Sequence, residues 1–131
     1  MKKLYPGLLV LVVFSSITFA QVVQKTGLTV SRIVICEDVK DREPAAIDSV
    51  FTNVERLCCF TEINGADEPT HIQHVWYHGN KEMLRIKLSV RASHWRTYSA
   101  KRILSEWTGN WRVDVIDDEG RRISQSYFQV K

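Results

Sequence analysis

The sequence MLRIKLSV at residues 83–90 decides the fold class. Its even-numbered residues are all apolar, whereas its odd-numbered residues are mostly polar. Successive side chains of a β-strand point to opposite faces, so this alternation predicts a strand with one buried face and one solvated face. The same pattern recurs at residues 109–117, where Trp111, Val113 and Val115 alternate with polar residues. The acidic sequence DDEG at 117–120 then predicts a turn, and residues 123–130 return as a strand that completes a β-hairpin.

The rest of the chain also favours short strands. They are expected at residues 28–36, 56–63, 70–78 and 95–99, with turns at 64–67 and 79–80. Residues 38–48 are interpreted as a mildly helical linker that crosses between sheets, and residues 100–107 as a loop. The sequence therefore predicts an all-β fold, an immunoglobulin-like antiparallel β-sandwich of about seven strands.

The first twenty residues are typical of a secretory signal peptide. Lys2 and Lys3 precede an apolar run at residues 8–14, and residues 18–20 (TFA) form a small-x-small cleavage site. We predict a signal peptide at residues 1–20 and a single β-sandwich domain at residues 21–131, exported to the periplasm or secreted. The alternative is a retained anchor, because residues 4–20 reach the lower end of the roughly 17 to 25 residues of a spanning helix. No second hydrophobic segment follows, so no transmembrane segment is expected after cleavage.

Cleavage also changes the charge of the chain. Removal of 20 of the 131 residues leaves 111, which is the size of one domain. It also removes two of the 18 basic residues. The remaining 16 basic and 15 acidic residues give a net charge of +1. A nucleic-acid partner would need a clustered basic face, so none is predicted.

Three cysteines, Cys36, Cys58 and Cys59, allow one internal disulfide in an oxidising compartment and leave one thiol over. Cys58 and Cys59 are adjacent and unsuited to pairing with each other, so Cys36 is expected to bond one of them. Such a bridge would contribute about 3 kcal/mol to stability.

The densest polar cluster gives the candidate ligand site. Trp95, Thr97, Ser99 and Lys101 share one face of a predicted strand, where they would line a shallow patch. Two neighbours complete the predicted ligand-binding set, namely Arg96 and Trp107. An exposed tryptophan beside charged donors suits a sugar or a protein partner. The alternative is a solvated edge strand protected by a lysine.

No catalytic, metal or cofactor site is predicted. His71 and His74 would point to opposite faces of their strand, and His74 and His78 would lie about 13 Å apart. Zinc ligands converge on one ion at about 2 Å each. Trp111 is assigned to the core because it shares its face with Val113 and Val115. No nucleophile elbow or paired-carboxylate motif is present, so the protein is expected not to be an enzyme.

Four blocks in order resemble a bacterial family of unknown function, number 2914. They are CFTE at 59–62, HxWYH at 74–78, WRTxSxK at 95–101 and GxWRV at 109–113, and the resemblance extends back to Cys36 and DREP at 41–44. It implies a secreted or membrane-tethered β domain and carries no activity, ligand or catalytic residue. It also implies a disulfide between Cys36 and Cys59, which leaves Cys58 as a free thiol.

Together these features predict an exported, non-enzymatic β-sandwich that recognises a cell-envelope glycan or protein by surface contacts. The first alternative is a structural or assembly domain, with Cys58 linking two copies. A hydrolase of envelope polymers is a third class, which would require a carboxylate and a histidine to meet in a cleft.

Overall fold

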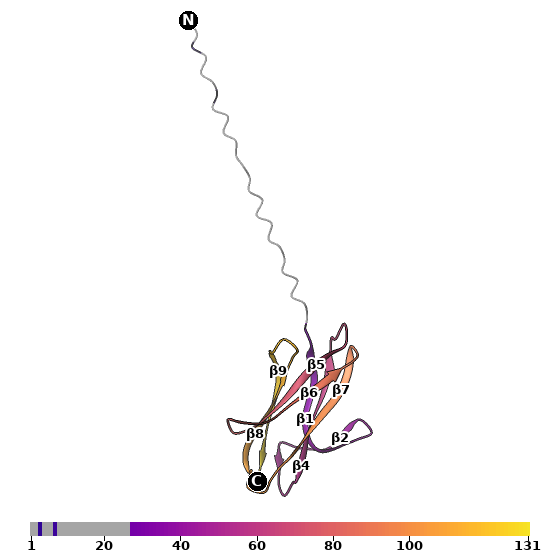
Figure 1. Ribbon diagram of the computed structural model, residues 1–131, viewed down its shortest axis with the longest axis vertical. Coiled ribbons are helices and arrows are strands. Elements are labelled where there is room, and N and C mark those ends of the chain that lie inside the picture. The colour runs from indigo at the N-terminus through magenta and orange to yellow at the C-terminus, as the bar shows by residue number, and fades with distance from the viewer. Residues whose placement is uncertain (1–2, 4–6, 8–26) are drawn as a thin grey trace.

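The computed structural model describes Lys3, Gly7 and residues 27–131. The predicted leader and its cleavage site lie outside the described residues, apart from Lys3 and Gly7. The described part contains nine strands and no helix (Figure 1). The strands are β1 (Thr29–Lys40), β2 (Glu43–Ile47), β3 (Val50–Phe51), β4 (Arg56–Asn64), β5 (Thr70–His78), β6 (Lys81–Val90), β7 (His94–Arg102), β8 (Gly109–Ile116) and β9 (Arg122–Val130). Accordingly, no described helix has the length and hydropathy that a membrane crossing requires.

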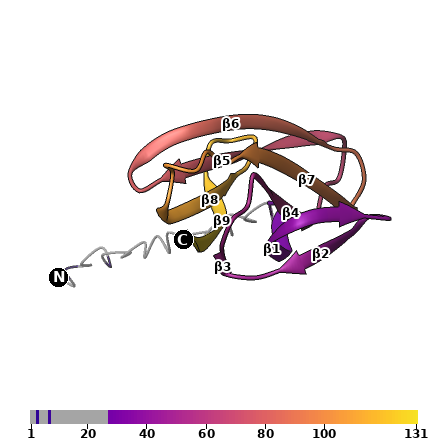
Figure 2. The same ribbon diagram turned by 90° about the horizontal axis from the view of Figure 1, so that it is seen from below.

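The strands form two sheets, as predicted for a β-sandwich. One sheet has the order β2-β1-β4-β7 and the other β3-β9-β8-β5-β6. Figure 2 shows the layers, with β5, β6 and β8 on one side and β1 and β2 on the other. Neighbouring strands are antiparallel except for the short parallel pair β3–β9. Among the described strands, β6 and β7 are the last of their sheets, so each has one edge that no other described strand pairs with.

The core lies between the sheets and is aromatic at its centre. Trp76, Trp111 and Phe128 are at most 3% exposed, and the Trp111 and Phe128 rings stack with centroids 6.0 Å apart. Their positions follow from the alternation in β5, β8 and β9, which turns every second side chain inward. The assignment of Trp111 to the core is confirmed.

Two local predictions were wrong. Residues 38–48 were expected to form a mildly helical linker, but they form the end of β1 and the strand β2, which pair as a hairpin with Lys40 opposite Glu43. Its two-residue turn places Asp41 at φ 52° and Arg42 at φ 62°. Such a turn normally contains Asn or Asp followed by Gly. The sequence has Arg42 in the position of the glycine, so the turn was not predicted. Residues 100–102 were expected to begin a loop, but β7 continues to Arg102.

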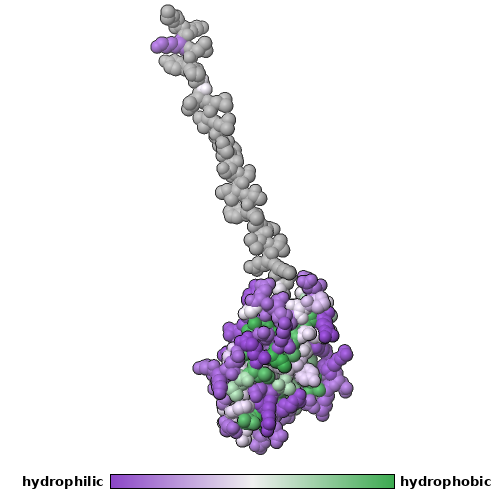
Figure 3. Space-filling model, viewed as in Figure 1, coloured by the Kyte–Doolittle hydropathy of each residue, from purple (hydrophilic) through white to green (hydrophobic). Residues whose placement is uncertain are grey.

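Figure 3 shows the surface on the side of the molecule that Figure 1 presents. Polar residues lie around the margin of this face and apolar residues gather toward its middle. The labelled strands β5, β6 and β7 cross this side in Figure 1. Two of the edge strands, β6 and β7, therefore lie close to this mixed surface.

Candidate functional site

The predicted patch on β7 does not form one exposed surface. Trp95, Thr97, Ser99 and Lys101 do share a face, but that face is turned toward the other sheet. Ser99 is only 3% exposed, and Trp95 packs beside the buried cluster that contains Ile72. The alternation was predicted correctly, whereas the direction of the face depends on the second sheet.

Ser99 belongs to a buried chain of hydrogen bonds that joins the sheets. Trp76 Nε1 donates to Ser99 Oγ at 3.0 Å, and Ser99 Oγ lies 2.7 Å from His74 Nδ1. His74 Nε2 lies 3.2 Å from Thr61 Oγ1, which donates to the carbonyl oxygen of Thr97 at 3.1 Å. Because the single Thr61 hydroxyl proton is used on that carbonyl, His74 Nε2 must carry the proton that bonds Thr61. His74 Nδ1 then accepts from Ser99, so every group in the chain is satisfied.

This arrangement requires a neutral imidazole. Burial lowers the pKa of His74 to about 3. Thr61, His74 and Ser99 are each at most 3% exposed, so no substrate can reach the serine and histidine pair in the folded protein. This chain of hydrogen bonds therefore has a structural role, because it satisfies polar groups that would otherwise be unpaired in the core.

The other histidines of the sequence lie in separate places. The His78 ring stacks on the Trp111 ring with centroids 4.7 Å apart. His94 Nδ1 lies 2.7 Å from Asn64 Oδ1. Within the described residues no three His, Cys, Asp or Glu side chains are grouped to hold a metal ion.

Lys101 and Trp107 contact each other at the end of β7. Lys101 Nζ lies 4.6 Å from the centre of the Trp107 ring, and burial lowers the pKa of Lys101. The Trp107 carbonyl oxygen accepts a 2.9 Å hydrogen bond from Trp111 Nε1, which ties the 103–108 segment to the core. A cation held over an indole ring stabilises this end of the sandwich.

Arg96 lies on the outer face of the four-stranded sheet. It is in register with Glu62 on β4, which in turn is opposite Arg32 on β1. Arg96 Nε lies 3.2 Å from Glu62, and Arg96 also forms an ion pair with Glu43 at the start of β2. The Arg96 guanidinium additionally donates to the Arg42 carbonyl oxygen at 3.3 Å. Arg96 thus holds the tip of the β1–β2 hairpin against β7.

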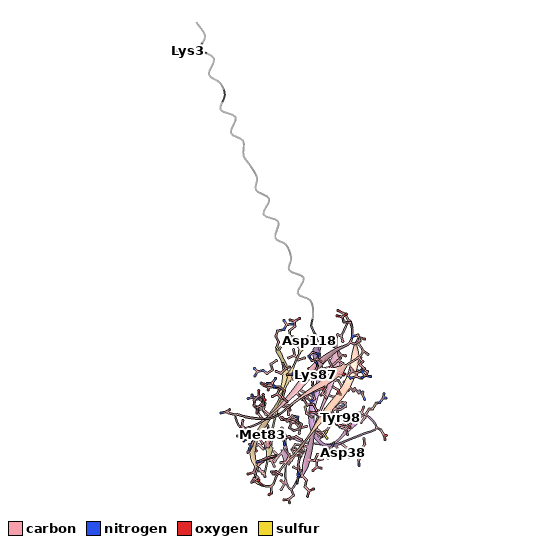
Figure 4. The ribbon with its side chains drawn as sticks, in the orientation of Figure 1. Lys3, Asp38, Met83, Lys87, Tyr98 and Asp118 are labelled. Carbon is pink, nitrogen blue, oxygen red and sulfur yellow. The ribbon has the colours of Figure 1, made fainter. Side chains whose placement is uncertain are left out.

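A cavity of about 810 Å³ lies between this hairpin tip and the free edge of β7, and we call it the hairpin groove. Tyr98 in the groove is 45% exposed and stands in register with the buried Phe60. In Figure 4 the labels of Tyr98 and Asp38 lie together on the side where β2 projects in Figure 1. The groove is lined by Val39, Asp41, Arg42, Phe60, Ala92, His94, Trp95, Arg96, Thr97 and Tyr98.

The structure therefore separates the six predicted ligand residues. Trp95, Arg96 and Thr97 line the hairpin groove, Ser99 lies in the core, and Lys101 and Trp107 contact each other elsewhere. Sequence reasoning missed Tyr98 and Arg42. Tyr98 lies on the opposite face from Trp95, Thr97, Ser99 and Lys101, on which the predicted patch was built, and Arg42 belonged to the segment interpreted as a linker.

A second aromatic surface lies on the outer face of the five-stranded sheet. Tyr77, Arg112 and Tyr127 form a row across β5, β8 and β9, and the Arg112 guanidinium lies 4.3 Å from the centre of the Tyr77 ring. Tyr127 is 62% exposed beside a shallow cavity of about 640 Å³. Arg112 Nε lies 2.8 Å from Asp114 Oδ1, close enough for an ion pair although the angle is poor for a hydrogen bond. The Asp114 carboxylate thus neutralises the charge of the Arg112 guanidinium.

The cysteines do not have the expected arrangement. Cys36 lies directly opposite Cys58 in the β1–β4 register, whereas Cys59 is opposite Ile35. Cys36 and Cys58 share a buried cluster on the outer side of the four-stranded sheet, while Cys59 belongs to the central core. All three are free thiols in this structure. The pairing of Cys36 with Cys59 does not fit, because successive side chains of a strand point to opposite faces.

Comparison with known proteins agrees with the fold and with the family resemblance. Residues 69–130 match the family model described as a protein of unknown function, DUF2914. The match confirms the resemblance over β5 to β9, the region that carries the HxWYH, WRTxSxK and GxWRV blocks. The CFTE block at 59–62 and the extension back to DREP at 41–44 and Cys36 lie outside the matched range. The DUF2914 description assigns no activity.

The structure is similar to that of an immunoglobulin-like protein from Pseudomonas aeruginosa, with a TM-score of 0.54. The alignment covers 82% of this chain and 99% of that protein at 9% sequence identity. No curated protein matches the chain. The predicted immunoglobulin-like sandwich is confirmed, and at this identity the likeness concerns the fold alone.

Proposed function

We propose that this β-sandwich is an exported, non-enzymatic domain that recognises a cell-envelope component in the hairpin groove. The observation that carries the proposal is Tyr98, which is 45% exposed in a cavity of about 810 Å³. It lies on β7, whose outer edge pairs with no strand in residues 27–131. Tyrosine and arginine are enriched in recognition surfaces, because each combines apolar contact area with polar donors. Arg42 provides a guanidinium in the same groove.

The free edge of β7 favours an extended polypeptide over a glycan as the bound component. The run His94, Trp95, Arg96, Thr97 and Tyr98 lines the groove continuously, from both faces of the strand. An edge strand presents unpaired backbone N–H and C=O groups, which a second extended chain can satisfy by adding to the sheet. A glycan would use the aromatic rings without these backbone groups, and it is the alternative ligand.

Assembly through a Cys58-linked dimer has less support. Cys58 is fully buried, so another copy cannot reach its sulfur unless the surrounding structure opens. Export itself rests on the sequence of residues 1–20. Mass spectrometry of the protein isolated from cells tests export, because a mature chain that begins at Gln21 is expected and an intact Met1 would contradict it.

Site-specific photo-crosslinking in the native host tests the proposed groove. With p-benzoyl-phenylalanine at position 98, irradiation is expected to produce a covalent adduct that protease treatment destroys. The matched control carries the same residue at position 127, an exposed tyrosine on the other sheet. An adduct at 127 alone would move the site to that face. An adduct at 98 that resists protease and yields to glycan hydrolases would replace the polypeptide with a glycan, and no adduct at 98 would contradict the proposal.

A further inference from the structure

Cys36 and Cys58 are placed as a disulfide pair. Directly opposed residues of antiparallel strands have Cα atoms about 4.5 to 5.5 Å apart, which lies within the roughly 4.4 to 6.8 Å that a disulfide needs. Cys36 and Cys58 are such opposed residues, and the Cys36 sulfur lies 3.8 Å from the Cys58 carbonyl oxygen. Both side chains are fully buried in one cluster with Phe60.

We propose that Cys36 and Cys58 form a disulfide that joins β1 to β4 in the exported protein. The proposal rests on the export that the proposed function includes. Cys59 is excluded as the partner, because its side chain enters the central core on the other side of the sheet. The bond would join the two strands just before β1 bends into the hairpin that forms one wall of the groove.

The oxidant is a thiol–disulfide oxidoreductase of the oxidising compartment. The Cys58 thiolate attacks the carrier disulfide and releases one carrier thiolate, which gives a mixed disulfide. The Cys36 thiolate then attacks the Cys58 sulfur and releases the second carrier thiolate. The protein loses two protons and two electrons, and the carrier disulfide becomes a dithiol. Because both sulfurs are fully buried in the finished domain, the exchange takes place before the hairpin closes over them.

In the folded domain the three thiols differ in pKa. The hydrogen bond from the Cys36 side chain lowers the pKa of Cys58 to about 7, with help from Arg56 and against the effect of burial. The same hydrogen bond and burial raise the pKa of Cys36. Burial raises the pKa of Cys59 and makes it a poor nucleophile. In the folded domain Cys58 is therefore the first of the three thiols to ionise. The exchange precedes this environment, so the pairing rests on the strand register and not on these pKa values.

Tryptic mapping of the full chain purified from the envelope fraction tests the pairing. Trypsin releases Cys36 in the peptide of residues 33–40, whereas Cys58 and Cys59 share the peptide of residues 57–81. Without reductant, the two peptides are expected as one linked species. The linkage should survive in Cys59→Ser and disappear in Cys58→Ser. Reduction should lower the Tm of the wild type and of Cys59→Ser by at least about 5 °C.

The opposite pattern, with linkage lost only in Cys59→Ser, would overturn the pairing. A chain that begins at Gln21 with three alkylatable thiols would refute the disulfide and leave export intact. A chain that retains Met1 would refute export instead. In that case refolding of denatured protein with oxidised glutathione decides the pairing, since linkage that depends on Cys58 supports it and absence of linkage contradicts it.

Discussion

At the scale of single residues, the polar chain through His74 explains how a histidine and a serine are accommodated in an apolar core. Trp76 and Thr97 fix its two ends, because an indole N–H only donates and a carbonyl oxygen only accepts. These two fixed ends require His74 to be neutral, with its proton on Nε2. A protonated imidazole would carry a buried charge and would leave the Ser99 hydroxyl proton without its acceptor.

The stability of the domain is therefore expected to fall in acid. The pKa of His74 is about 3 in the folded protein and 6.5 ordinarily, so the unfolded chain binds more protons between these values. Acidification through this window favours unfolding, with a slope that approaches about 1.4 kcal/mol per pH unit. Urea unfolding from pH 7 to pH 4 measures it.

The matched variants for this prediction are His74→Gln and His71→Gln, which lie on the same strand. His74→Gln should be less stable at pH 7, by about 1 to 3 kcal/mol, because Thr61 and Ser99 lose their partner. It should also show a flatter pH profile. His71→Gln should keep the steep profile, and an equally steep profile in His74→Gln would show that other groups cause the acid sensitivity.

At the scale of elements, the β1–β2 hairpin carries backbone strain where it meets β7. Asp41 and Arg42 both adopt positive φ, a region that costs an L-residue other than glycine about 1 kcal/mol or more. The turn is held by Arg96, which pairs with Glu43 and bonds the Arg42 carbonyl oxygen. This clamp keeps the Arg42 side chain in the groove.

Replacing Arg42 with glycine should separate stability from recognition. Arg42→Gly keeps the carbonyl that Arg96 uses and relieves the strain, so the free energy of unfolding should rise by about 0.5 to 1 kcal/mol. Crosslinking from position 98 should fall, because the groove loses a guanidinium. Denaturant unfolding and adduct yield measure the two effects.

The control is Ala46→Gly, which relieves a φ of 57° on β2 at a residue that does not line the groove. It should stabilise the domain to a similar extent and leave the adduct yield unchanged. An equal loss of adduct in both variants would mean that hairpin stiffness, rather than the Arg42 side chain, controls binding.

At the scale of the whole molecule, the two sheets end in four edge strands within the described part of the chain, and these edges must avoid pairing with other copies. β6 is longer than the edge strand β7, and it carries Lys81, Arg85 and Lys87 among its exposed residues. Lysines on an edge strand oppose the addition of another strand, because pairing would bury or crowd their charges. β7 stays open at the groove, where the proposed polypeptide would add to it.

Removing one edge charge should promote self-association. Lys87→Ile on β6 leaves an apolar, unpaired edge, and sedimentation velocity should show a dimer or larger species that the wild type lacks. Gln73→Ile is the matched control, since Gln73 is the register partner of Lys87 on the interior strand β5. Association in both variants alike would point to added surface hydrophobicity instead of the free edge.

The particular residues show which parts of the protein were predictable from sequence. The alternation in β6, β8 and β9 identified strands and placed Trp111 in the core, because a side-chain period of two is local to the strand. The Asp41–Arg42 turn was missed because its backbone conformation is stabilised by Arg96, more than fifty residues away. Ser99 was assigned to a ligand patch because its buried partners, His74 and Trp76, belong to the other sheet.

The sequence by itself determined the seven longer strands, the two-layer class and the alternation of faces along them, since these follow from local side-chain periodicity. Only the tertiary structure decided which face is inside, which cysteine faces Cys36, and that Tyr98 and Arg42 meet in one groove. The reason is physical: register and layer packing join residues that are distant in the chain, and no local pattern records which strand will lie opposite.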